Sequence, residues 1–294
     1  MKKKAAIILC AGKGTRMNDA SKNKVCFRCA GIPVIRRIVD NMRLAGINLF
    51  VIVVGYRATD VMKCLDGEEG VVYAFQKKQL GTGHAALCGL KALSAIGYED
   101  SVIISMGDMV VASDVVRQML RLSQRQQAVC AVQSVAYNRS GGRIVMRKNK
   151  LYGIVEFADA ASMAVSDLPL EQRAAAFCAL GMSLEKANRL VEINNSRVME
   201  NYCVLNGEVF TAKDILEMPY VNTALYSFPI KEIVKALLLV KRDNAQNELY
   251  LTDGIEFMAR KGKATVLKID EPEKMLTYST KDELSKIDHF LRKQ

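Results

Sequence analysis

The sequence has 294 residues, 50% of them hydrophobic, and a formal net charge of +11. This length supports a substantial core, and we expect one domain over residues 1–294. No apolar run approaches the roughly 20 residues that span a bilayer. The short run after the N-terminal lysines is too brief for a signal-peptide core, so we expect a cytoplasmic protein with no membrane partner.

Positive charge is concentrated at one end. Residues 1–50 carry eleven lysines and arginines against only Asp19 and Asp40. Such a field suits nucleic acid or a small polyphosphate. Because no aromatic residues alternate with these cations, we predict small phosphorylated substrates and no nucleic-acid partner. The oligomeric state stays open, and a homo-oligomer is compatible with the sequence.

The first 125 residues alternate strands and helices. Strands are expected at 4–9, 49–54, 71–75 and 101–106, and helices at 33–46, 58–65, 84–96 and after 114. This rhythm predicts an α/β, Rossmann-like fold with a mixed, mainly parallel sheet flanked by helices. Ligands of such sheets bind at the carboxyl ends of the strands, where the loops after the first, third and fourth strands would meet.

The pattern changes after residue 128. Short antiparallel strands are expected at 128–136, 142–147 and 151–157, with a turn at 148–150. Residues 158–219 are predicted to form a helical insertion, with its clearest helices at 170–180 and 184–193. A strand at 221–228, helices at 230–240 and 250–260, a strand at 264–269 and a helix from Lys281 complete the chain.

Three loops carry candidate chemistry. The first is the glycine-rich stretch 9–17 after the first strand, where Gly12 and Gly14 can bring backbone N–H groups against phosphate and Lys13 and Arg16 add charge. It is neither a Walker A motif nor GxGxxG. Its position at the end of a βαβ strand predicts a phosphate site, extended by Lys24.

The second loop, residues 76–85, follows the third strand and opens a helix. Gln76 offers a donor and an acceptor, and Gly81 and Gly83 leave exposed amides that could read a base or a sugar. His84 alone is interpreted as a packing residue at the helix start. An ordinary βα loop is the alternative.

The third loop follows the fourth strand, which ends in Gly107-Asp108. A carboxylate leaving a buried strand opposite a phosphate loop is suited to hold Mg²⁺. The alternative is a helix N-cap, but Ser113 and Asp114 already serve the next helix.

Together these motifs resemble the sugar-nucleotide pyrophosphorylases, a family of nucleotidyltransferases, and most closely the uridylyltransferase domain of the bacterial bifunctional N-acetylglucosamine-1-phosphate enzyme. The resemblance covers residues 4 to about 157 and 220 to 284. It rests on ordered matches at 11–17, 23–25, 76, 79–85, 107–108, 142–144, 153–156, 222–223 and 244–253.

The resemblance implies roles for single residues. Arg16 and Lys24 would hold the phosphates of the two substrates, and we expect both at the surface of the cleft. The remaining matches are assigned by the group they contact: Ala11, Gly12 and Gly14 for the phosphates; Gln76 and Gly81, with Thr82 beside them, for the base; Gly142, Glu156 and Asn222 for the sugar; and Asp108 for the metal.

The sequence departs from the family at four places. Ser279 takes the position of the second metal ligand, which is usually asparagine, while Asp270, Glu271 and Glu273 lie just upstream. Met106 replaces a tyrosine, and Ala224 replaces the glycine of an Asn-Thr-Gly motif. The fourth departure is an insertion of roughly fifty residues between Glu156 and Asn222, which we expect to cover the acceptor site.

These observations predict a Mg²⁺-dependent enzyme that joins an NTP, UTP or dTTP in preference to CTP, to a sugar 1-phosphate and releases pyrophosphate. Three alternatives remain open. They are a transferase using CTP or another NTP on a different phosphorylated acceptor, a catalytically impaired sensor that binds an NDP-sugar, and, least favoured, a nucleic-acid binder.

Overall fold

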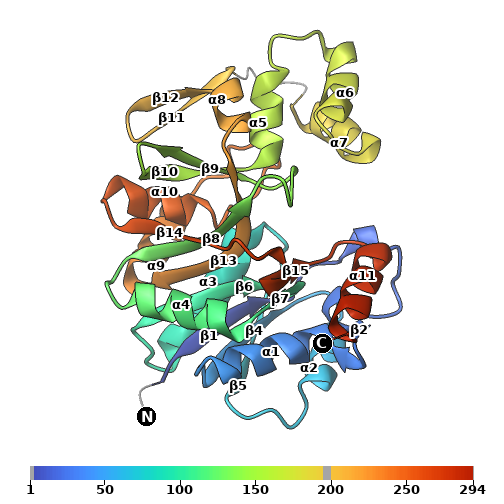
Figure 1. Ribbon diagram of the computed structural model, residues 1–294, viewed down its shortest axis with the longest axis vertical. Helices are drawn as coiled ribbons and strands as arrows, with labels where there is room; N and C mark the ends of the chain where they lie inside the picture. The colour runs from blue at the N-terminus through green and yellow to red at the C-terminus, as the bar shows by residue number, and fades with distance from the viewer. Residues whose placement is uncertain (1–2, 195–199, 294) are drawn as a thin grey trace.

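The computed structural model describes residues 3–194 and 200–293, and its centre is one mixed β-sheet (Figure 1). The strands of this sheet are β1 (Ala5–Leu9), β4 (Leu49–Val54), β5 (Val71–Phe75), β6 (Ser101–Met106), β8 (Ala128–Ser134), β9 (Arg143–Arg147), β10 (Lys150–Val155), β13 (Tyr220–Pro229) and β14 (Ala264–Lys268). The order is β10-β9-β13-β6-β1-β4-β5, with β8 pairing with β13 and β14.

Parallel pairing joins β6, β1, β4 and β5, as well as β8 and β14. β13 runs antiparallel to β6, β8 and β9. The predicted α/β fold with a mixed, mainly parallel sheet is therefore confirmed, and the carboxyl ends of β1, β5 and β6 lie at one edge.

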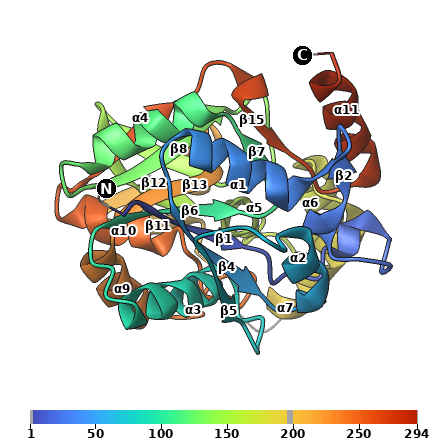
Figure 2. The ribbon, with the colours of Figure 1, turned by 90° about the horizontal axis from the view of Figure 1, so that it is seen from below.

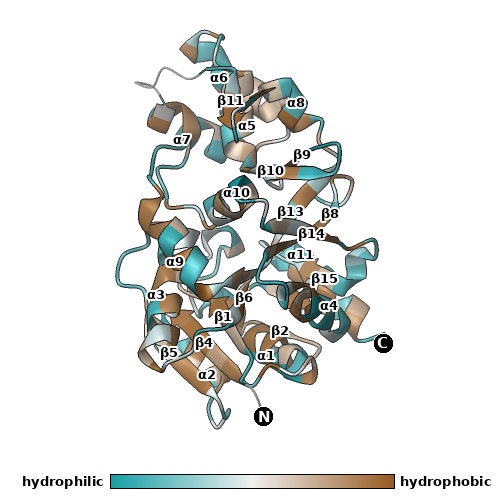
Figure 3. Cartoon of the chain, turned by 90° about the vertical axis from the view of Figure 1, so that its left-hand side faces the viewer, coloured by the Kyte–Doolittle hydropathy of each residue, from teal (hydrophilic) through white to brown (hydrophobic). Residues whose placement is uncertain are grey.

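Both faces of the sheet are covered, because alternate residues of its central strand enter two different cores. Ala6 and Ile8 of β1 pack into one core, and Ile7 and Leu9 pack into the other. A strand buried on both faces needs a continuous apolar run, which β1 and β4 have (brown in Figure 3).

Helices form a layer on each side of the sheet (Figure 2). One layer contains α1 (Val34–Leu44), α2 (Ala58–Cys64), α4 (Ser113–Ser123) and α11 (Lys281–Leu291). The opposite layer contains α3 (Thr82–Ala95), α9 (Ile230–Leu239) and α10 (Asp253–Arg260). In the described residues no helix is long and apolar enough to cross a bilayer.

The inserted segment lies beyond β9 and β10, at the end of the molecule farthest from the N-terminus (Figure 1). Its elements are α5 (Phe157–Ala164), α6 (Leu170–Ala179), α7 (Leu184–Asn194), β11 (Tyr202–Leu205), β12 (Glu208–Thr211) and α8 (Ala212–Leu216). Two small cores hold it together, and one of them includes Ala245 of the main body.

Among its described residues the predicted helical insertion contains four helices, but residues 202–211 depart from the prediction, because β11 and β12 form an antiparallel hairpin there. Asn206 and Gly207 connect the two strands, and both have positive φ (52° and 79°). An Asn-Gly pair between short apolar runs is a strong hairpin signal, which the helical interpretation overlooked. Part of the predicted insertion, residues 195–199, lies outside the described residues.

Two short strand pairs were not predicted, because two or three residues are too few to show a period. β2 (Arg28–Cys29) pairs with β3 (Ile32–Pro33). More important for function, β7 (Met109–Val111) pairs antiparallel with β15 (Met275–Thr277). This second pair returns the C-terminal part of the chain to the loop that follows β6.

Strand β13 contains a bulge between Asn222 and Tyr226, and within it Ala224 has a φ of 61°. The left-handed region costs an L-residue about 1–2 kcal/mol because its Cβ approaches the following carbonyl oxygen. The glycine that the family carries here would avoid this cost.

We therefore expect Ala224→Gly to raise the free energy of unfolding by up to about 1 kcal/mol, after the greater entropy of glycine in the unfolded chain is subtracted. Thermal or urea unfolding measures this change. The control Ala6→Gly, in the regularly paired strand β1, should destabilise the protein. A loss of stability in Ala224→Gly would contradict the strain argument.

Candidate active site

The predicted phosphate loop, residues 10–17, begins where β1 ends and turns sharply at Gly14, whose φ is 62°. A Cβ at Gly14 would lie 2.8 Å from the Cβ of Lys24, so only glycine lets the loop pass this close to Lys24. Gly12, Lys13 and Arg16 are exposed, while Ala11 is buried and its carbonyl accepts from Gln79 Nε2 at 2.7 Å. The loop thus presents its polar backbone and two cations to solvent.

Asn23 is fully buried and fixes the base of this loop through hydrogen bonds. Its Nδ2 donates to the carbonyls of Cys10 (3.2 Å) and Tyr56 (2.7 Å), and its Oδ1 accepts from the N–H of Val25 (3.1 Å). It therefore caps the 3₁₀ turn η2 (Lys24–Cys26) and sets the position of Lys24. Asn23 belongs to the family match at 23–25, but the sequence analysis gave it no role.

Lys24 forms an ion pair with Asp108, with Nζ 2.5 Å from Oδ2. Its side chain is 9% exposed and that of Asp108 is 27% exposed. The ammonium lies 4.9 Å from the ring centre of Tyr278, whose hydroxyl donates to the Lys24 carbonyl at 2.7 Å. The expectation that Arg16 and Lys24 both lie at the cleft surface is correct for Arg16 and wrong for Lys24, which Asp108 and Tyr278 bury.

The β7–β15 pair brings the backbone of the residue before Ser279 against the backbone of Asp108. The N–H of Tyr278 donates to the carbonyl of Asp108 at 3.4 Å, and Ser279 follows directly. Close contact at Gly107 fixes this corner, since a Cβ there would lie 2.6 Å from Cys10 Sγ. Glu271 is instead paired with Lys274 at 2.5 Å.

The candidate ligands are the carboxylate of Asp108, which is paired with Lys24, and the hydroxyl of Ser279, whose N–H donates to the carboxylate of Glu283. Among the described residues, no group of three or more His, Cys, Asp or Glu side chains is arranged to hold a metal ion. Mg²⁺ often uses one or two protein carboxylates and completes its octahedron with water and substrate phosphates. The residues present therefore fit Mg²⁺ only together with a phosphorylated substrate.

Gln76, Gly81 and His84 form one cluster after β5. Gln76 is 5% exposed, and its Nε2 contacts the Gly81 carbonyl (3.3 Å) and His84 Nδ1 (3.0 Å). With Nε2 donating to the protein, Oε1 is the atom left to accept a hydrogen bond from a base. His84 is therefore more than a packing residue, because it orients Gln76.

The loop at 80–83 is clamped by residues 249–251. The N–H of Gly83 donates to Leu249 O at 2.7 Å, and the N–H of Leu251 donates to the hydroxyl of Thr82 at 3.1 Å. A Cβ at Gly81 (φ 107°) would lie 2.6 Å from the same Leu249 carbonyl. Thr82 thus supports the loop, which brings Gly81 beside Gln76 as predicted.

The three proposed sugar contacts also converge. The N–H of Asn222 donates to Gly142 O at 2.8 Å, and a Cβ at Gly142 would lie 3.1 Å from Glu156 Oε2. Asn222 Nδ2 donates to the hydroxyl of Tyr226 at 2.6 Å, and Glu156 Oε1 accepts from Thr252 at 3.2 Å. Residues 80 positions apart in the sequence therefore form one polar group at the start of the insertion.

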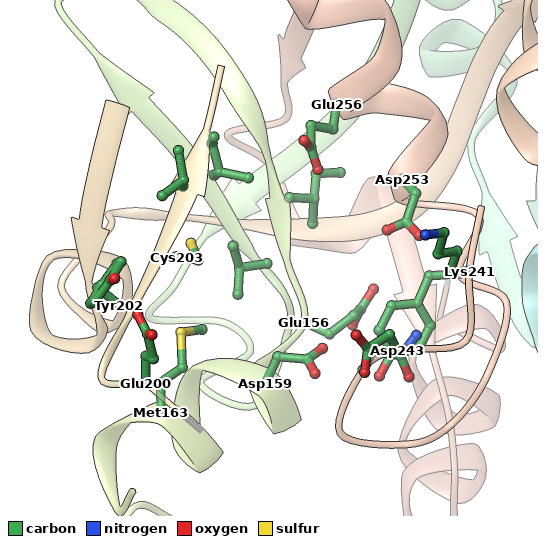
Figure 4. A pocket seen from close by; sticks show the side chains of 16 residues that line it. Glu156, Asp159, Met163, Glu200, Tyr202, Cys203, Lys241, Asp243, Asp253 and Glu256 are labelled. Atoms are coloured by element: carbon green, nitrogen blue, oxygen red, sulfur yellow. The ribbon is translucent and has the colours of Figure 1, made fainter. Parts of the chain in front are cut away.

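Glu156 opens into an acidic pocket of about 610 Å³ between the insertion, α10 and the loop at 241–244. Figure 4 shows Glu156, Asp159 and Asp253 with their carboxyl groups turned into it. Burial raises the pKa of Glu156 to about 7, and burial followed by the charge of Glu256 raises the pKa of Asp253 to about 7. The sequence did not reveal this pocket, because the insertion forms one wall.

Asp253 provides a test of this pocket through pH. A carboxyl with a pKa of about 7 in the folded protein binds more protons than its unfolded counterpart between about pH 4 and pH 7. The free energy of unfolding should therefore fall as pH rises through this window. Asp253→Asn should remove the decrease in the free energy of unfolding that Asp253 causes. The melting temperature of this variant should therefore exceed that of the wild type by more at pH 8 than at pH 5.

The matched control is Asp243→Asn, an exposed carboxylate of the same pocket. Its difference in melting temperature from the wild type should change less with pH. If the melting temperatures of the wild type and Asp253→Asn changed equally with pH, the raised pKa of Asp253 would be contradicted.

Comparisons with known proteins identify the family of the chain. Over 294 residues the chain is 30% identical to the bifunctional protein GlmU of Geotalea daltonii, covering 99% of this chain and 53% of that protein. It is 28% identical to the bifunctional protein GlmU of Acetivibrio thermocellus, covering 98% and 51%. The chain thus spans about half the length of these relatives.

Two solved structures share the fold, each with a TM-score of 0.68 over the whole chain. One is a Bacillus anthracis protein assigned as a glucose-1-phosphate thymidylyltransferase, in complex with sucrose (18% identity, 96% of that chain covered). The other is a UDP-glucose pyrophosphorylase complexed with UDP-glucose (16% identity, 100% covered).

The family model of the MobA-like NTP transferase domain matches residues 6–180. This chain belongs to the family of MobA-like NTP transferase domains, which is a family of nucleotidyltransferases.

Proposed function

We propose that this protein transfers a uridylyl group from UTP to a sugar 1-phosphate, giving a UDP-sugar and pyrophosphate. The observation that carries the proposal is the Lys24–Asp108 pair beside the phosphate loop, which places a cation and a potential metal ligand 2.5 Å apart. The similarity along the whole chain to proteins named GlmU supports a sugar-nucleotide product.

In this reaction a phosphate oxygen of the sugar phosphate forms a bond to the α-phosphorus of UTP, and the bond between the α- and β-phosphates breaks. Both reactants are anionic and repel each other, so the protein must supply positive charge and fixed geometry. Lys24 and Arg16 provide charge, and the amides of the loop at 11–14 hold phosphate oxygens. No nucleophilic side chain is required.

Mg²⁺ held by Asp108 and Ser279 together with phosphate oxygens would neutralise charge on the triphosphate. The base would lie over the cluster of Gln76, Gly81 and Thr82. The sugar would contact Gly142, Glu156 and Asn222, near the beginning of the insertion, so the insertion covers the acceptor. Because the insertion and Ala224 distinguish this site from the family pattern, the acceptor sugar is open.

A panel of nucleoside triphosphates and sugar 1-phosphates, with pyrophosphate release as the readout, tests the function. We expect turnover with UTP and at least one sugar 1-phosphate. Release from CTP alone with a phosphorylated acceptor that is not a sugar would replace the uridylyl proposal. Binding of UDP-sugars without turnover for any pair would favour the sensor.

Base recognition is tested at Gln76. Its Oε1 can accept from the N3–H of uracil, whereas cytosine has no hydrogen at N3. Gln76→Ala should therefore weaken discrimination between UTP and CTP by about 1–2 kcal/mol in kcat/KM. The control Gln79→Ala removes an amide that contacts the phosphate loop, so it should affect both nucleotides equally. An unchanged ratio in Gln76→Ala would place base recognition elsewhere.

The metal ligands are tested by turnover as a function of Mg²⁺ concentration. Asp108→Asn should nearly abolish turnover, because it removes the carboxylate of the proposed site. Ser279→Ala should cost little, since a hydroxyl is a weak ligand, and Ser279→Asn should raise the affinity for Mg²⁺. Asp114→Asn, which removes a carboxylate paired with Lys274, is the control. Equal loss of turnover in Ser279→Ala and Asp108→Asn would contradict this ranking of the two ligands.

A further inference from the structure

A second pocket, of about 490 Å³, separates the end of the phosphate loop from helix α7 of the insertion. Thr15 and Arg16 line it on the side of the loop, and Lys186 and Arg189 line it on the side of α7. Phe157, Met182 and Leu190 provide apolar wall. The inserted segment therefore reaches the phosphate loop itself as well as the sugar-binding residues.

Helix α7, which carries these two exposed cations, is anchored by apolar contacts. Lys186 and Arg189 are three residues apart and so project from the same side of the helix. Their neighbours Ala187 and Leu190, 0% and 2% exposed, pack into a core with Phe157 and Ala245. Because these apolar contacts anchor α7 to the main body, the cations face the loop without depending on a salt bridge.

Three positive charges converge on this pocket: those of Arg16, Lys186 and Arg189. Among the ion pairs within residues 3–194 and 200–293, none involves Arg16, Lys186 or Arg189. Burial, first, and the charge of Arg16, second, lower the pKa of Lys186, while the smaller effects of Glu156 and Asp159 raise it. Glu185 and Glu248 also line the pocket, so the cations outnumber the carboxylates by three to two.

We propose that Lys186 and Arg189 join Arg16 in binding the terminal phosphates of the nucleotide, which leave as pyrophosphate. This inference rests on the proposed nucleotidyl transfer, which it deepens by making the insertion part of the phosphate site. Lysine and arginine donors suit phosphate oxygens. Positive charge at the leaving group stabilises the charge that develops there as the bond breaks.

The same cations could instead bind an anionic group on the acceptor. The distribution of charge around the two pockets disfavours this alternative. Glu156, at the proposed sugar site, opens into the acidic pocket with Asp159 and Asp253. That wall repels an additional anion on the sugar. The pocket between Arg16 and α7 continues directly from the phosphate loop and carries excess positive charge.

The test is binding of pyrophosphate with Mg²⁺, measured by calorimetry on the full chain without acceptor. Lys186→Ala and Arg189→Ala should each weaken binding at least about fivefold, and the double variant by about thirtyfold or more. Arg189→Lys should retain most of the affinity. Lys213→Ala, which removes a cation of the insertion outside the pocket, is the control and should bind as the wild type does.

Steady-state kinetics distinguishes binding of the terminal phosphates of the nucleotide from binding of an anionic group on the acceptor. The double variant should raise the KM for pyrophosphate in the reverse direction and leave the KM of the acceptor unchanged. A raised acceptor KM with unchanged pyrophosphate binding would overturn the inference, as would wild-type pyrophosphate affinity in the double variant. Failure of the wild type to release pyrophosphate from any substrate pair would count against the proposed function instead, since the calorimetry needs no turnover.

Discussion

The ion pair between Lys24 and Asp108 holds three distant parts of the chain together. Lys24 follows the phosphate loop, Asp108 follows β6, and Tyr278 of the C-terminal segment lies over the ammonium and bonds to the Lys24 carbonyl. Removing one partner would leave a part-buried charge without compensation, which is costlier than the pair itself is stabilising. The geometry of the phosphate loop therefore depends on this contact.

The same charges suit the proposed chemistry. In the proposed reaction a triphosphate would compete for Lys24 and a divalent cation would compete for Asp108, so binding of both ligands would exchange one internal ion pair for two interactions with ligands. Such an exchange avoids the penalty of leaving either charge unpaired in a low-dielectric cleft. The insertion adds further positive charge, because Lys186 and Arg189 lie across a pocket from Arg16. On its opposite side, the insertion borders an acidic pocket beside Glu156.

Much of the main body was predictable because its signals are local. Buried runs such as 49–54 and 101–106 set the strands, and the convergence of loops followed from the rule that parallel strands share a carboxyl edge. The clustering of Gly142, Glu156 and Asn222 came from the family resemblance. The hairpin at 202–211 was predictable from Asn206-Gly207 and was missed.

Other features could not be read from the sequence, because they depend on tertiary contacts. The burial of Lys24 requires Tyr278, 254 positions away. The role of His84 depends on a contact with Gln76 across a loop. The cations of α7 share a pocket with Arg16 only because the insertion folds back toward the loop after β1. The raised pKa of Asp253 depends first on burial and then on nearby carboxylates, some of which come from outside its own helix.

The central claim is that Lys24 binds substrate phosphate during the reaction. Turnover of Lys24→Ala, measured by pyrophosphate release at saturating UTP, sugar 1-phosphate and Mg²⁺, tests it most directly. Lys22→Ala, which removes a neighbouring lysine that lies over Phe27, is the control. The account predicts a loss of about a hundredfold or more, corresponding to ~3 kcal/mol of transition-state stabilisation, in a protein that remains folded. Near-normal release from folded Lys24→Ala would contradict it.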